Sequence, residues 1–292
     1  MSIDVLQEKI RKMKNPSMVD LALKTSDLPP RLIAEEGSAA AAYGRFCRET
    51  MGALKGLVPA VRVGFTAFAI LGEAGLAQLR EVLKFASGQG YYVALEAPYL
   101  LSPMMAEATA EAVWGENAIY PCDGLIISAY AGSDILKPFL PFVKSKKKDL
   151  FAVVRTSNKS ASEIQDLLTG SRLVHAAAAD LVNRFGVDNG GKFGYARVGV
   201  VAGANSAESL RNLRAKYPGL FLLIDDMDYS GCNAKICGSA FDKFGHGAVV
   251  CAGPTVTAAW QQAENDGPDY TEHIIAAAER MKKNLTRYVT VL

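Results

Sequence analysis

The stretch VGVVAGANSAESLRNLRAKYPGLFLLID, residues 198–225, places two short apolar runs on either side of a more polar segment. The runs Val198–Ala204 and Leu220–Asp225 are continuously apolar rather than alternating, which is typical of strands buried on both faces in a parallel sheet. Residues 206–216 between them have helical spacing. The stretch therefore predicts a strand–helix–strand unit of a parallel α/β fold.

The same unit recurs along the whole chain. Six further runs are predicted as strands: Met18–Leu23, Val58–Phe65, Tyr91–Ala97, Gly124–Tyr130, Leu150–Thr156 and Gly247–Cys251. Seven further segments are predicted as helices, at about 35–55, 73–88, 103–114, 134–143, 171–185, 234–243 and 269–285. Eight strands that are each followed by a helix predict a (β/α)₈ TIM barrel, with a doubly wound open sheet as the alternative because counting does not show closure.

The ends of the predicted elements carry further signals. Residues 4–13 predict an extra N-terminal helix, and we expect segment 1–15 to close the barrel bottom within a single domain, 1–292. Ser102-Pro103 predicts a helix start, Ser160-x-x-Glu163 a capping box and Asn205-x-x-Glu208 a looser version of one. Because function in such barrels lies on the loops after the strands, the strand ends hold the candidate site residues.

Composition narrows the class of protein. The chain has 292 residues, of which 50% are hydrophobic and 21% charged, so it can bury a core. Lys+Arg 32 against Asp+Glu 30 gives a net charge of +2, which argues against a nucleic-acid partner. No apolar run approaches the roughly 18 residues of a membrane span, the N-terminus lacks a signal-peptide core, and the five cysteines form no C-x-x-C. We expect a cytoplasmic protein without a cofactor or membrane contact.

Short motifs in a fixed order connect these elements to a known family. They are MSIDVLQEKIRKMKNP at the start, Val58–Val61, Tyr130–Asp134, Val154–Asn158, Ile164–Leu167, Val198–Ala204 and Phe221–Ile224. Together they resemble the group-2, bacterial-type orotidine 5′-phosphate decarboxylases along essentially the whole chain. The resemblance implies a TIM barrel, dimers with active sites near the subunit interface, and a role in UMP biosynthesis.

The resemblance also implies a catalytic network of two lysines and two aspartates, which this chain lacks. Arg62 stands at the family's strand-2 lysine, and Glu96 at the first aspartate of its D-x-K-R-G-D motif. Pro98 replaces the catalytic lysine and Leu101 the second aspartate. Proline has no proton to give, and loss of a positioned general acid costs about 10²–10⁴ in rate.

The positions that hold the phosphate in the family differ as well. Its P-G-x-G-A-Q-G-G loop is replaced by a segment that contains Asp225, Asp226 and Asp228, whose charges would repel a dianion. Its N-S-S-R becomes Cys251–Pro254, so that Pro254 stands where the resemblance implies a phosphate-binding arginine. Ser157 and Asn158 match its pyrimidine-contacting loop, although a role in capping the following helix is an equal alternative.

Several groups have both a functional and a structural interpretation. Arg62 can supply positive charge, but an ion pair with Glu96 is the favoured interpretation. The acidic loop with Glu96 can gather a cation, yet aspartates in loops more often stabilise a turn, so no metal site is predicted. The three histidines, His175, His246 and His273, lie away from the strand ends and predict no site.

Three functions remain open. The first is a non-catalytic family member with a structural or regulatory role, either as a homodimer or in a hetero-oligomer with an active paralogue. The second is a barrel whose mouth binds a different, cationic or neutral ligand through Arg62, Glu96 and Asp225–Asp228. The third is ordinary orotidine 5′-phosphate decarboxylation, as similarity to the family suggests.

Overall fold

A computed structural model describes residues 2–97, 100–225, 227, 232–263 and 267–292. Eight parallel strands form a closed barrel in the order β1-β10-β9-β8-β5-β4-β3-β2. They are β1 Ser17–Asp20, β2 Ala60–Gly64, β3 Tyr92–Glu96, β4 Gly124–Ser128, β5 Asp149–Arg155, β8 Val198–Gly203, β9 Leu222–Asp225 and β10 Ala248–Ala252. Val19 on β1 pairs with both Val61 on β2 and Ala252 on β10, which closes the barrel and excludes the open sheet. All eight predicted strands are confirmed.

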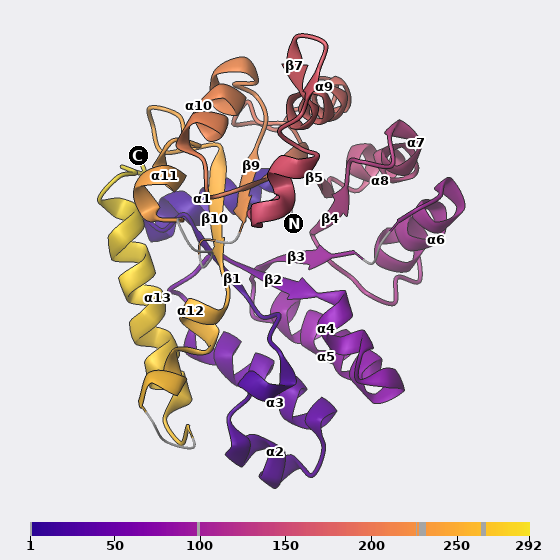
Figure 1. Ribbon diagram of the computed structural model, residues 1–292. Helices are drawn as coiled ribbons and strands as arrows, with labels where there is room; N and C mark the ends of the chain where they lie inside the picture. Colours follow the sequence, from indigo (N-terminus) through magenta and orange to yellow (C-terminus); the bar gives the residue numbers. More distant parts are fainter. Residues whose placement is uncertain (1, 98–99, 226, 228–231, 264–266) are drawn as a thin grey trace.

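Helices surround the barrel (Figure 1). The longer ones are α1 Ile3–Met13, α3 Ala39–Ala53, α5 Gly72–Gly88, α6 Pro103–Trp114, α9 Val174–Gly186, α10 Ala207–Lys216 and α13 Tyr270–Thr286. The shorter ones are α2 Pro30–Glu36, α4 Phe65–Ala69, α7 Ser133–Leu136, α8 Leu140–Ser145, α11 Ala234–Gly238 and α12 Pro254–Thr257. The described residues also form four 3₁₀ turns, at Thr25–Asp27, Lys137–Phe139, Lys159–Glu163 and Ala259–Ala263. None of the helices in the described ranges is both long and apolar enough to cross a bilayer.

Several predicted helices differ from the observed ones. Segment 35–55 is divided into α2 and α3 at Gly37, whose φ of +67° ends the first helix before Ser38 caps the second. Segment 134–143 is divided into α7, a 3₁₀ turn and α8, with prolines at the first turns of the last two. In segment 234–243, the observed helix is shorter than predicted and ends at Gly238. Helix α9 begins only at Val174 because Leu168–Thr169 (β6) and Arg172–Leu173 (β7) form a hairpin that the sequence analysis missed.

The predicted helix starts are only partly correct. The Oγ of Ser102 accepts a hydrogen bond from Met105 N at 3.3 Å, with Pro103 at the first helical position, as predicted. The capping box at Ser160 is wrong, because the 3₁₀ turn there follows Asn158 and has no side-chain cap. The cap of α10 is Ser206 rather than Asn205, whose side chain contacts Arg155 and Ser157 instead.

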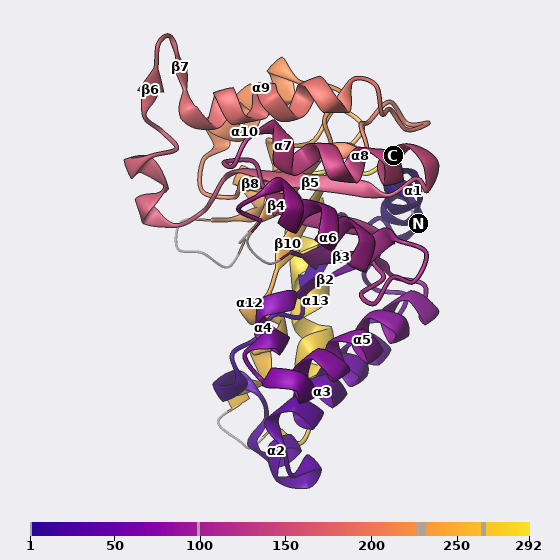
Figure 2. The same ribbon diagram turned by 90° about the vertical axis from the view of Figure 1, so that its right-hand side faces the viewer.

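The amino-terminal end of the barrel is filled by aromatic side chains. Tyr92 and Phe151 are buried there, and a Cβ on Gly124 would lie 2.5 Å from the Tyr92 Oη and 2.9 Å from the Phe151 ring. Glycine at this position therefore leaves room for both rings. Helix α1 lies next to this end, at the right of Figure 2. There, Gly247 N, just before β10, donates to the Oε1 of Gln7 at 3.0 Å. The opposite end, where the strands finish, holds the candidate site.

Candidate functional site

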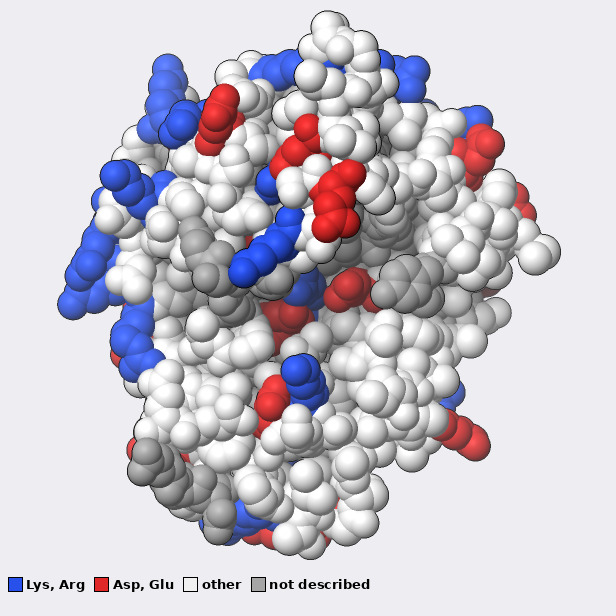
Figure 3. Space-filling model, in the orientation of Figure 1, with Lys and Arg blue, Asp and Glu red and all other residues white. Residues whose placement is uncertain are grey.

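The carboxyl ends of the strands form a mouth that faces the reader in Figures 1 and 3. Acidic side chains lie in the hollow near the centre of this face, with basic side chains beside them (Figure 3). Glu96 and Asp225 end β3 and β9, and Ser157 lies just beyond β5, as a barrel requires of its site residues. Arg62 lies inside β2 rather than at its end.

Arg62 is the centre of a buried ion-pair network. Its Nη2 donates to Asp20 Oδ2 at 2.5 Å and its Nη1 to Asp225 Oδ1. Its Nε is buried and has no hydrogen-bond partner among the residues that the structure describes. Burial opposes the positive charge, yet the two aspartates raise the pKa of Arg62 well above its usual value. Asp20 is the register partner of Arg62 on the neighbouring strand, which explains their close approach. The guanidinium is therefore charged, and each of its two terminal nitrogens is bonded to a carboxylate.

The predicted pair between Arg62 and Glu96 is wrong. Glu96 ends β3, and no hydrogen bond or ion pair joins its carboxylate to any other residue of the described part of the chain. The Glu96 side chain is exposed at the mouth, yet the protein around its carboxyl displaces enough water to raise its pKa. The positive charge of Arg62 opposes that rise, and Asp20 and Asp225 add to it. Register explains the difference, because Arg62 lies opposite Ala94 and Glu96 is two residues further along β3. Glu96 thus carries a carboxyl group without a direct counter-ion.

Ser157 and Asn158 lie in the loop after β5. Ser157 is buried, and its Oγ donates to the backbone oxygen of Asp225 at 3.1 Å. A Cβ on Gly203 would come within 2.6 Å of that Oγ, so glycine permits the loop to approach β8 this closely. Asn158 accepts from Thr156 Oγ1 at 2.5 Å and makes no side-chain cap. Neither residue has the predicted helix-capping role.

A second network, which the sequence analysis missed, holds the same loop. Arg155 Nε and Nη2 each lie 3.0 Å from an oxygen of Asp166, and His175 Nδ1 lies 3.1 Å from Asp166 Oδ1. The hydrogen bond from Arg155 is the main cause of the lowered pKa of Asp166. Ser209 Oγ lies 3.4 Å from the other nitrogen of His175. His175 thus has partners that sequence spacing could not reveal, because Asp166 precedes the β6–β7 hairpin and Ser209 lies in helix α10.

The remaining predicted site residues are not drawn into one cluster. Leu101 is 78% exposed beside the mouth, and Pro254 begins α12 on its exposed side. Pro98, Asp226 and Asp228 lie outside the described residues. Within the described ranges no three His, Cys, Asp or Glu side chains are arranged to hold a metal ion.

Similarity to known proteins identifies the family. The chain is 31% identical over 256 residues to the orotidine 5′-phosphate decarboxylase of Rhodopirellula baltica, covering 85% of each chain. The chain belongs to the orotidine 5′-phosphate decarboxylase family. The decarboxylase of Clostridium novyi is 26% identical over 286 residues, 98% of each chain. No family model matches the sequence.

Solved structures of the orotidine 5′-phosphate decarboxylase family share the barrel. The Leishmania donovani enzyme superposes with a TM-score of 0.77 at 23% identity and covers 99% of both chains. The Plasmodium berghei enzyme gives 0.75 at 13% identity over 97% of this chain and 99% of its own. The predicted fold and the predicted family are therefore both confirmed.

Proposed function

We propose that this chain is a non-catalytic member of the orotidine 5′-phosphate decarboxylase family, with a structural or regulatory role linked to cytoplasmic pyrimidine biosynthesis. The main observation behind the proposal is the charge and the ion pairing of Arg62, which we align with a family lysine. Its guanidinium is buried between Asp20 and Asp225 and stays charged. Such a group is a poor proton donor for a carbanion formed on a pyrimidine ring.

Two further features support the loss of this chemistry. Leu101, aligned with a family aspartate, presents an exposed apolar side chain. Asp225, aligned with the start of the family's phosphate loop, adds negative charge where the resemblance implies a dianion. Each charge-assisted hydrogen bond that the phosphate loses would cost about 1.5–3 kcal/mol. Neither the nucleotide nor its transition state is then well bound.

Ordinary decarboxylation is the second candidate, and family membership favours it. Its difficulty is chemical, since Pro98 carries no proton and Arg62 holds its proton tightly. The remaining candidate is a barrel whose mouth binds a different ligand. This candidate is compatible with a non-catalytic family member, because it requires binding at the mouth and does not require decarboxylation.

Thermal unfolding with and without millimolar UMP tests the proposal. A ligand that binds the native state at 100 times its Kd adds about 2.7 kcal/mol of stability, which raises the melting temperature by several degrees. The Rhodopirellula baltica relative serves as the positive control. We expect UMP to raise the melting temperature of the control alone, and an equal rise for this chain would overturn the proposal.

We propose further that the chain forms a homodimer. Met104 and Met105, in the first turn of α6, are 74% and 40% exposed. Contiguous apolar surface of this kind is typical of interaction sites. Light scattering of the native chain and of Met104→Glu tests this: the native chain should have twice the monomer mass and the variant less. A hetero-oligomer with an active paralogue would appear instead as a monomer that gains mass when the paralogue is added.

A further inference from the structure

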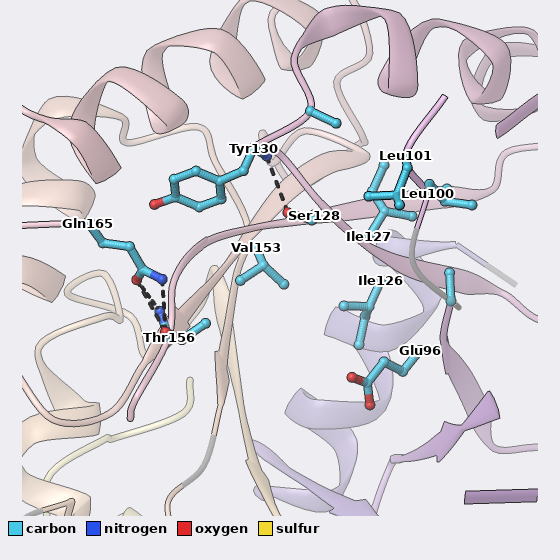
Figure 4. Close-up of a pocket in the computed structure, with 12 residues that line it drawn as sticks. Glu96, Leu100, Leu101, Ile126, Ile127, Ser128, Tyr130, Val153, Thr156 and Gln165 are labelled. Atoms are coloured by element: carbon cyan, nitrogen blue, oxygen red, sulfur yellow. Dashed lines mark hydrogen bonds between the residues drawn. The ribbon is translucent and has the colours of Figure 1, made fainter. Parts of the chain in front are cut away.

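A cavity of about 450 Å³ opens beside the ion-pair network, at the carboxyl ends of β3, β4 and β5 (Figure 4). Its walls are mainly aliphatic and include Leu100, Leu101, Ile126, Ile127 and Val153. Cavities of this size and lining accommodate small organic molecules rather than solvent alone. The walls therefore favour a ligand with an apolar body.

Most polar groups of the cavity are already paired. Tyr130 Oη donates to Val154 O at 2.6 Å, and Ser128 Oγ accepts from Tyr130 N at 3.2 Å. At the far end, Gln165 Oε1 accepts from Thr156 N at 2.8 Å (Figure 4). These groups need nothing from a ligand.

Glu96 differs from every other group of the cavity lining. It is the one ionisable carboxyl among the lining residues, and its carboxylate has no hydrogen-bond or ion-pair partner in the described part of the chain. The terminal nitrogens of Arg62, the nearby cation, are occupied by Asp20 and Asp225. Among the described residues, the charged groups that act on Glu96 are the guanidinium of Arg62 and the carboxylates of Asp20 and Asp225. Together with Glu96 they make three carboxylates against one guanidinium, which repels anions and attracts cations.

We propose that this cavity binds a small organic cation, such as a primary amine on an aromatic or branched aliphatic body, with its ammonium beside Glu96. The apolar body gains about 25 cal/mol per Å² of surface removed from water, and the ammonium neutralises the unpaired carboxylate. A phosphate dianion has no apolar body to remove from water, and it cannot neutralise a carboxylate. The inference goes beyond the proposed function, because it concerns a different ligand and does not require that decarboxylation be lost.

Three probes that differ only in their head group test the inference: benzylamine, benzyl alcohol and benzoate. Titration calorimetry at pH 7.5 should show benzylamine binding most tightly and benzoate at least about tenfold more weakly. Glu96→Gln should weaken benzylamine by about tenfold and leave benzyl alcohol unchanged. Glu107→Gln, the same change at an exposed position of α6, should alter none of the three.

A second variant keeps the inference falsifiable if Glu96→Gln fails to fold. Leu101 is 78% exposed, so Leu101→Arg should fold normally while it adds positive charge at the cavity rim. It should weaken benzylamine and strengthen benzoate. Benzoate binding the native chain as well as benzylamine, or neither variant weakening benzylamine, would overturn the inference. Decarboxylation of orotidine 5′-phosphate would instead refute the proposed function, and these probes would still decide the cation site.

Discussion

Arg62 binds two carboxylates from different parts of the barrel, Asp20 of β1 and Asp225 of β9. At this depth each ion depends on the others, because a buried charge without its partner is strongly destabilising. Sequence reasoning paired Arg62 with Glu96, which is close in the strand order. Only the register, which sets Asp20 directly opposite Arg62, could identify Asp20 as a partner.

Replacing Arg62 tests this network. Arg62→Met should lower the free energy of unfolding by about 3–5 kcal/mol, because Asp20 is left buried and uncompensated. Adding Asp20→Asn to that variant should recover part of the loss. Urea denaturation measures both, with Arg31→Met as the control, since its exposed pair with Glu35 is screened by solvent and contributes little to stability. Equal effects of the two arginine substitutions would contradict the account.

Asp149, at the start of β5, predicts a pH dependence of stability. Burial raises its pKa to about 8, although the hydrogen bond from Tyr92 Oη at 2.7 Å opposes the rise. The unfolded chain loses this proton near its ordinary pKa of about 3.9. Between these two values the folded state holds a proton that the unfolded state has lost, so stability falls as pH rises.

The Asp149→Asn variant tests this dependence. It should make the free energy of unfolding vary less between pH 5 and pH 8 than it does in the native chain, because the substituted amide does not ionise. Urea denaturation at both pH values provides the measurement. Asp188→Asn, at an exposed position, should leave the dependence unchanged. An unaltered dependence in Asp149→Asn would rule out this carboxyl as its source.

At the scale of the elements, the strands could be predicted and several connections could not. Continuous apolar runs predicted all eight strands, because a strand covered on both faces must be apolar throughout. The β6–β7 hairpin has only two residues in each strand, which is too short for any periodicity. The capping motif at Ser160 failed because the chain there forms a 3₁₀ turn that follows Asn158.

Helix caps give a prediction at this scale. Ser102→Ala and Ser206→Ala should each lower the free energy of unfolding by about 1 kcal/mol, because each Oγ accepts a hydrogen bond from a backbone amide of α6 or α10. Ser160→Ala is the matched control and should change little, since its hydroxyl caps no helix. Chemical denaturation of the three variants under one condition measures the difference. A cost at Ser160 equal to the other two would show that this account of the caps is wrong.

At the scale of the whole molecule, the barrel and the residues at its mouth bear on different properties, the first on the fold and the second on function. The fold matches that of the Leishmania donovani enzyme over 99% of both chains, while the mouth holds the ion pair of Arg62 with Asp225 and the nearby carboxyl of Glu96. Function on such a scaffold is set by the residues at the strand ends rather than by the barrel. The sequence could predict those identities, but not the pairing of Arg62 or the solitary position of Glu96.

We also propose that residues 1–292 fold as a single domain, with α1 as part of the barrel. Ile3, Leu6 and Ile10 of α1 are buried, which ties this helix to the rest of the core. Calorimetry should therefore record one unfolding transition, and deletion of residues 1–15 should lower its temperature. Two separate transitions in the native chain would contradict a single domain.

The most direct test of the central claim is turnover of orotidine 5′-phosphate by the purified chain. The Rhodopirellula baltica relative, assayed alongside, defines full activity. Loss of the general acid alone lowers the rate by about 10²–10⁴, and loss of charge stabilisation lowers it further. We predict that no UMP forms above the uncatalysed background. UMP formation in proportion to the amount of this protein would contradict the account and establish the chain as a working decarboxylase.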